Sequence, residues 1–130
     1  MTAAQKFLEK CSALKEKGCA FVLEQGMIVC RGFADLGYEE FVMLTNNKIC
    51  SLYSGKISEL PDEDKKHFFA VPDEGMLTDR IVKSGFDIRG MEFENQRIWK
   101  VLLQNPETHI EIMFEGPSIK DALLECLLAN

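Results

Sequence analysis

The chain offers few residues that could perform acid–base chemistry. It has two histidines: His67 ends a short helical pattern, and His109 begins an alternating strand pattern. An imidazole titrates near neutral pH and suits proton transfer. However, local spacing gives neither histidine a partner. We therefore expect both to be scaffold or surface residues, and the sequence identifies no catalytic residue.

The cysteines are the candidate nucleophiles and metal ligands. Their number is odd, and neither C-x-x-C nor a zinc-type pairing occurs among them. Their apolar neighbours are typical of buried thiols. The sequence thus predicts thiols without disulfides, a cytoplasmic location and no metal site. A cysteine–histidine site assembled from distant segments stays open. The five positions are Cys11, Cys19, Cys30, Cys50 and Cys126.

Charge and motifs limit the classes of partner. Neither G-x-G-x-x-G nor G-x-x-x-x-G-K occurs, so we expect no cofactor. The net charge is −6, from 15 Lys/Arg and 21 Asp/Glu, which disfavours binding to nucleic acid. No apolar run approaches the ~18 residues that would span a bilayer, so we expect no membrane association. The acidity is compatible with a basic protein partner, or with a role in solubility alone.

The pattern at both ends of the chain predicts helices, Ala3–Lys17 and Ile119–Leu128. An irregular stretch predicts a helical insertion near 61–84. With 130 residues, the chain is expected to form a single α+β domain, 1–130. In this fold, an antiparallel sheet of about 6–7 short strands packs against the N- and C-terminal helices.

The predicted strands form two hairpins and one meander. The parity of apolar residues changes at Gly90, which predicts a β-bulge there. Trp99 shares parity with Val101 and Leu103, which predicts a place in the main core. The predicted strands are Cys19–Glu24, Met27–Gly32, Tyr38–Leu44, Lys48–Tyr53, Phe86–Glu94, Arg97–Gln104 and a last strand from Ile110.

Two surfaces stand out from this pattern. Alternation places four glutamates, at positions 92, 94, 111 and 115, on one sheet face, which is by default a solvated outer face. On the C-terminal helix, Leu124 and Leu128 form a second apolar stripe opposite the main one. This stripe predicts an interface. It would be covered either by the 61–84 insertion or, as we favour, by a second copy of the chain in a homodimer.

The expected function is that of a non-enzymatic acidic protein-binding module, with the partner unspecified. The order of elements in a small acidic protein resembles that of bacterial secretion chaperones and of small immunity or inhibitor proteins. This resemblance covers architecture alone and carries over no residue. The alternative is a small enzyme or ligand-binding domain whose site is assembled from dispersed residues such as His67, His109 and a cysteine.

Overall fold

The computed structural model describes residues 2–33 and 37–129 and has the predicted α+β architecture. Among these residues, eight strands form two antiparallel sheets, of five and three strands. The chain divides into two compact units, Met1–Pro72 (unit 1) and Asp73–Asn130 (unit 2). Where the sequence predicted one sheet, the strands therefore separate into two, and Pro72, which has no N–H to donate to a ladder, stands at the division.

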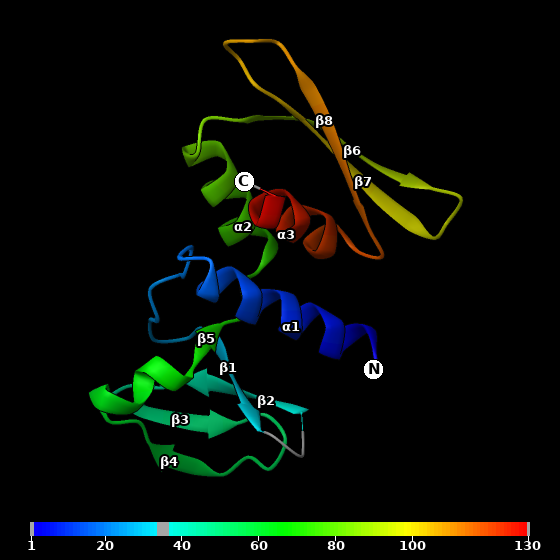
Figure 1. The fold of residues 1–130 in the computed structure, drawn as a ribbon. Helices are drawn as coiled ribbons and strands as arrows, with labels where there is room; N and C mark the ends of the chain where they lie inside the picture. The colour runs from blue at the N-terminus through cyan, green and yellow to red at the C-terminus, as the bar shows by residue number, and fades with distance from the viewer. Residues whose placement is uncertain (1, 34–36, 130) are drawn as a thin grey trace. The chain divides into compact units, whose positions relative to one another are not determined.

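Unit 1 combines one α-helix with the five-stranded sheet (Figure 1). The strand order is β4-β3-β2-β1-β5, and a 3-10 helix precedes the last strand. Its elements are α1 (Ala3–Glu16), β1 (Ile28–Phe33), β2 (Gly37–Met43), β3 (Lys48–Ser51), β4 (Ile57–Glu59), η1 (Asp62–His67) and β5 (Phe69–Ala70).

Helix α1 forms where the sequence predicted it. The Thr2 side chain accepts a hydrogen bond from the Gln5 amide at 3.1 Å and so caps the first turn. Gly18 follows the helix with a φ of 92°, a conformation that glycine adopts without strain. The buried residues of the helix, which recur at the i, i+3 and i+4 spacing of one helix face, are Phe7, Leu8, Cys11 and Leu14.

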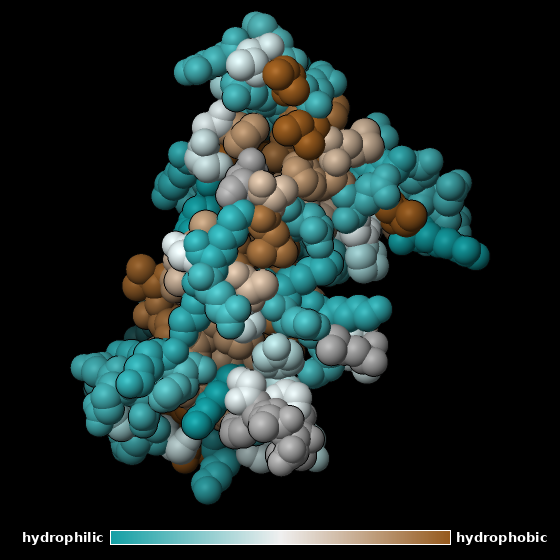
Figure 2. Space-filling model, in the orientation of Figure 1, coloured by the Kyte–Doolittle hydropathy of each residue, from teal (hydrophilic) through white to brown (hydrophobic). Residues whose placement is uncertain are grey.

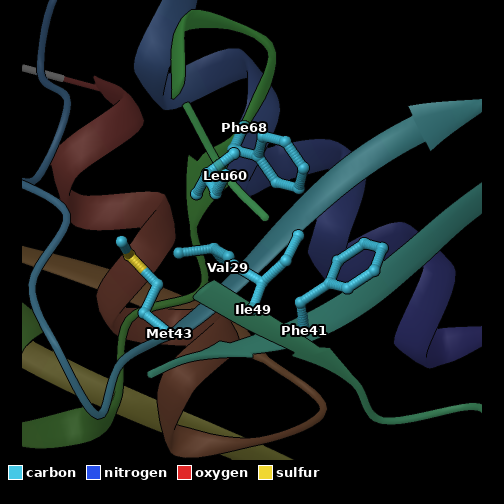
Figure 3. Packing of buried hydrophobic residues seen from close by; sticks show 6 residues of the cluster. All are labelled: Val29, Phe41, Met43, Ile49, Leu60 and Phe68. Carbon is cyan, nitrogen blue, oxygen red and sulfur yellow. The ribbon is translucent and has the colours of Figure 1, made fainter. Parts of the chain in front are cut away.

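A buried cluster holds η1 against the sheet. Figure 3 shows its six labelled side chains pointing toward one another. The rings of Phe41 and Phe68 meet edge to face, with centroids 5.6 Å apart. Phe68, which immediately follows η1, is buried and ties this end of η1 to the sheet. The cluster consists of Val29, Phe41, Met43, Ile49, Leu60 and Phe68.

The predicted strand Cys19–Glu24 is not a strand in the structure. The turn after it does form, because the Met27 amide donates to the Glu24 carbonyl at 3.2 Å. However, β1 pairs with β2 on one side and with β5 on the other. Both edges of β1 are occupied, so a strand distant in sequence has taken the place of the local hairpin partner.

Unit 2 packs two helices with the three-stranded meander (Figure 1). The bulge predicted at Gly90 is confirmed by a register shift between Ile88 and Gly90. Asn95 and Gln96 turn the first hairpin with φ values of 52° and 54°, as a type I′ turn requires. The elements are α2 (Glu74–Lys83), β6 (Asp87–Glu94), β7 (Ile98–Gln104), β8 (Glu111–Gly116) and α3 (Ile119–Ala129).

The junction between β8 and α3 is tightly built. The Ser118 hydroxyl accepts a hydrogen bond from the Asp121 amide at 3.1 Å and caps α3. The first turn of α3 lies so close to Gly116 that a Cβ there would be 2.6 Å from the Asp121 Cβ. A glycine is therefore required where the last strand passes into the helix.

Candidate functional site

The two histidines belong to different units. His67 is exposed at the end of η1 in unit 1, and His109 is exposed before β8 in unit 2. His109 has a φ of 60° in a turn where its amide donates to the Asn105 carbonyl at 2.8 Å. Among the described residues, no group of three or more histidine, cysteine or acidic side chains is arranged to hold a metal ion.

All five cysteines carry thiols and none forms a disulfide, as predicted. Burial raises the pKa of Cys30 to about 12, and nearby Glu40 adds to the shift. Burial likewise raises the pKa of Cys126 to about 12. Both thiols stay protonated at neutral pH, which makes them poor nucleophiles. Cys19 and Cys50 are the two that are partly exposed.

The glutamates predicted to share a face have a lysine among them. Lys100 is opposite Glu92 on one side and Glu115 on the other. Its ammonium group forms ion pairs with Glu94 and with Glu115. The hydrogen bond from Lys100 to Glu94 raises the pKa of the lysine. The center of this face is therefore a partly neutralised ion-pair network rather than a uniformly acidic surface.

The opposite face of the same hairpin carries an apolar surface that extends beyond the core. Phe93 and Trp99 are directly paired across β6 and β7, with ring centroids 4.9 Å apart. Met91 lies two residues before Phe93 on the same face, opposite the buried Val101. Phe93 is 48% exposed and Met91 39% exposed. We call Met91, Phe93 and Trp99 the hairpin patch.

The position of Trp99 corrects the prediction that it belongs to the main core. Val101 and Leu103, which share its face, are buried, whereas Trp99 is only partly buried. Gly116 is the residue opposite Trp99 on β8 and has no side chain to cover it. The alternation therefore placed Trp99 on the correct face of β7. However, the residues that bury this face do not extend as far as Trp99.

Other apolar side chains are exposed on this sheet. Figure 2 shows hydrophobic atoms at the surface among hydrophilic ones over the part of the molecule that β6–β8 form. Because α3 packs against β7 and β8, the outer strand β6 receives less cover, and its last four residues are all exposed. The further exposed side chains on these strands and beside them are Ile98, Ile110, Ile112 and Met113.

Unit 1 contains a groove of about 440 Å³ that the sequence did not predict. The end of α1, the segment 19–23 and the stretch from η1 to Pro72 form its walls. Three lysines and no acidic residue occur among the fourteen that line it, so we call it the basic groove. Its lining residues fall into three separate segments, which no local motif could connect. The charged residues of the lining are Lys15, Lys65 and Lys66.

The three lysines are held differently. Lys15 donates hydrogen bonds to the backbone carbonyls of Lys66, at 2.5 Å, and Phe68, at 2.7 Å. Lys65 forms an ion pair with Asp62 at 2.8 Å and a hydrogen bond with Asn47. Lys66 is exposed. Lys15 is therefore fixed in position, Lys65 is partly neutralised, and Lys66 stands at the solvent side.

The predicted interface residues on α3 have different surroundings. Leu124 is fully buried within a single chain, and Leu128 is partly exposed. Helix α2, which lies within the predicted insertion, packs against α3. The burial of Leu124 thus needs no second copy of the chain. Of the two leucines, Leu128 is the one that keeps solvent-exposed surface.

Comparisons with known proteins give no match: this holds for protein-family models, for curated proteins and for solved structures. The described part of the chain also lacks any helix with the length and apolar character needed to cross a bilayer.

Proposed function

We propose that this chain is a non-enzymatic protein-binding module whose contact surface is the hairpin patch. The observation that carries the proposal is the exposure of Phe93 beside the partly buried Trp99. Exposed apolar clusters on soluble proteins mark interaction sites, and aromatic side chains supply most hot spots of binding energy. The ring contact and the tight type I′ turn hold these aromatics in place before binding, which reduces the entropy cost of association.

The charge of unit 2 favours a basic partner. Residues 73–130 contain six Lys/Arg and eleven Asp/Glu, a net charge of −5, whereas residues 1–72 contain nine and ten, a net charge of −1. Glu92 and Glu94 alternate with Met91 and Phe93 along β6. These glutamates therefore lie on the face opposite the hairpin patch, where Lys100 pairs with Glu94, and the net charge of unit 2 would speed the encounter with a basic partner rather than pair with charges across the apolar contact.

The alternative of an enzyme with dispersed catalytic residues has less support. The two histidines are exposed and belong to different units. Burial keeps Cys30 and Cys126 protonated, because it raises the pKa of each thiol to about 12. A binding function needs only the exposed apolar and charged groups described above.

The test is quantitative capture of partners from a native cytosolic extract by three tagged forms of the protein. These are the wild type, Phe93→Ser and a control, Tyr53→Ser. Tyr53 suits the control because it is an aromatic residue, 92% exposed, in unit 1. We expect a protein retained by the wild type and by Tyr53→Ser, and lost with Phe93→Ser. Its purified form should bind the wild type on the order of 30-fold more tightly than Phe93→Ser.

Added salt should weaken the purified complex, since acidic and basic surfaces attract one another less when screened. A partner that binds wild type and Phe93→Ser equally would refute the hairpin patch as the contact surface. A chain that retains no protein in any form, and converts a small molecule instead, would support the enzymatic alternative.

Two further expectations belong to the same proposal. A reducing location such as the cytoplasm is supported by the five thiols. Self-association through α3 would have to use Leu128 and its neighbours, because Leu124 is already buried. The hairpin patch contains two exposed apolar side chains, Met91 and Phe93, whereas Leu128 is only partly exposed.

A further inference from the structure

We propose that the basic groove of unit 1 binds a medium-chain alkyl carboxylate, a ligand class separate from the protein partner proposed for unit 2. The groove's volume of about 440 Å³ lies within the range of small-molecule sites. At ~30 Å³ for each water-sized group, it holds roughly ten to fifteen non-hydrogen atoms. Decanoate has a size in this range and serves as the probe.

The walls of the groove suit an apolar chain. The partly buried Phe21 and Leu23, the buried Phe68 and Phe69, and the exposed Val22 contribute apolar surface to the lining. Val22 is 77% exposed, so apolar surface at the groove remains open to solvent. An alkyl chain placed there would remove this surface from water, which is the main source of affinity for apolar ligands.

The rim of the groove suits a single negative charge. Its lining combines three lysines with no acidic residue, although the whole chain has a net charge of −6. An ammonium group has three donors, and the two carbonyl contacts of Lys15 use two of them. Because Lys65 is paired with Asp62, the head group would meet Lys66 and the remaining donor capacity of Lys15. A carboxylate accepts such charge-assisted hydrogen bonds well.

Two cysteines provide the readout. Cys19 lines the groove and is partly exposed, whereas Cys50 is partly exposed on β3 and does not belong to the lining. Bound decanoate should slow the alkylation of Cys19 by iodoacetamide at least fivefold, as peptide mass spectrometry would measure. The rate at Cys50 in the same molecule should not change. The alkylation rate of each cysteine with decanoate is divided by its rate without decanoate. A difference in intrinsic reactivity between Cys19 and Cys50 therefore does not affect the comparison.

Variants and ligand analogues test the role of charge. Lys66→Glu should raise the decanoate concentration that gives half-protection by about fivefold or more. Lys6→Glu is the matched control, because Lys6 is an exposed lysine of unit 1 outside the lining, and it should leave that concentration unchanged. Decanol should protect Cys19 less than decanoate does, and decyltrimethylammonium should not protect it. Lys66→Ala removes the charge without reversing it, and it tests the same role of Lys66 if Lys66→Glu disturbs folding.

Several outcomes would overturn the proposal. Equal slowing at Cys19 and Cys50 would indicate a general effect of the surfactant. Equal protection by the cationic analogue would remove the role of the lysines. Protection that depends on protein concentration without decanoate would mean that a second copy of the chain covers the groove. Phe93→Ser should leave protection by decanoate intact, so failure of the protein-binding proposal would be distinguishable from failure of this one.

Discussion

The ammonium nitrogen of Lys15 lies 2.7 Å from the backbone carbonyl oxygen of Phe68. This contact joins the last turn of α1 to the residue that follows η1, 53 positions later in the chain. The same ammonium group donates to the Lys66 carbonyl. A positive charge is favourable beside the carbonyls at a helix C-terminus, so Lys15 both positions η1 and shapes the basic groove.

Replacing Lys15 should weaken unit 1. Lys15→Met keeps the aliphatic part of the side chain and removes the charged donor. We expect a loss of about 1–2 kcal/mol in the free energy of unfolding, because hydrogen bonds from a charged group are lost at a partly exposed site. Urea denaturation followed by far-ultraviolet circular dichroism measures it. Lys6→Met, at an exposed position of the same helix, should leave the stability nearly unchanged.

The hairpin patch can be followed through the only tryptophan in the chain, Trp99. Phe93→Ala removes the ring 4.9 Å from the indole, and the tryptophan emission should shift to longer wavelength as water gains access. The stability cost should be about 1 kcal/mol. Val82→Ala, at an exposed apolar position of α2, should not move the emission. An unchanged spectrum in Phe93→Ala would mean that the two rings are not in contact in solution.

The partial burial of Trp99 also sets the size of its own contribution. Trp99→Ala should cost roughly 1–3 kcal/mol, below the ~3–5 kcal/mol typical of a fully buried aromatic side chain. Thermal unfolding monitored by circular dichroism would show it. A cost at the upper end of that larger range would place Trp99 in the main core after all.

Two glycines of unit 2 should respond oppositely to the same substitution. Gly116→Ala would place a Cβ 2.6 Å from the Asp121 Cβ and 2.8 Å from the Ala122 amide nitrogen. We expect a destabilisation of about 2–3 kcal/mol as the start of α3 shifts. Gly90→Ala meets nothing within 4 Å and should be neutral or slightly stabilising. Equal stabilities of the two variants, measured by urea denaturation, would contradict the close approach of α3 to β8.

The buried thiols predict a loss of stability in alkaline solution. Burial raises the pKa of Cys30 and of Cys126 from 9.0 to about 12. Well below pH 9, both thiols are protonated whether the chain is folded or unfolded, so they add no pH dependence. Between pH 9 and about 12, the unfolded chain releases their protons and the folded chain does not, so stability falls as pH rises. Cys126→Ala should reduce this slope, as urea denaturation at a series of pH values would show.

The self-association of the chain can be decided at Leu128. If a homodimer forms through α3, Leu128→Lys should give a folded monomer, because Leu128 is the partly exposed member of the predicted pair. Sedimentation equilibrium of the wild type and the variant measures the mass. A wild type that stays monomeric at high concentration, with a variant of the same stability, would exclude this interface.

Local sequence determined most of the elements. The Thr2 cap and the apolar spacing fixed α1, and the parity change at Gly90 located the bulge. Ser118 after Gly116 marked the start of α3. Each of these features depends on residues a few positions apart, and short-range sterics and hydrogen bonding decide them. The free-thiol state of the cysteines likewise followed from their odd number and their spacing.

Tertiary structure alone decided which strands pair and which side chains on an apolar face are buried. Cys19–Glu24 has strand-like composition, but β5 occupies the edge of β1 that a local hairpin would have used. Trp99 has core parity, yet the residue opposite it is Gly116, and the patch it forms with Phe93 reaches solvent. The basic groove combines three segments that only folding brings together. Periodicity specifies which face a side chain occupies, whereas burial depends on what another part of the chain places over that face.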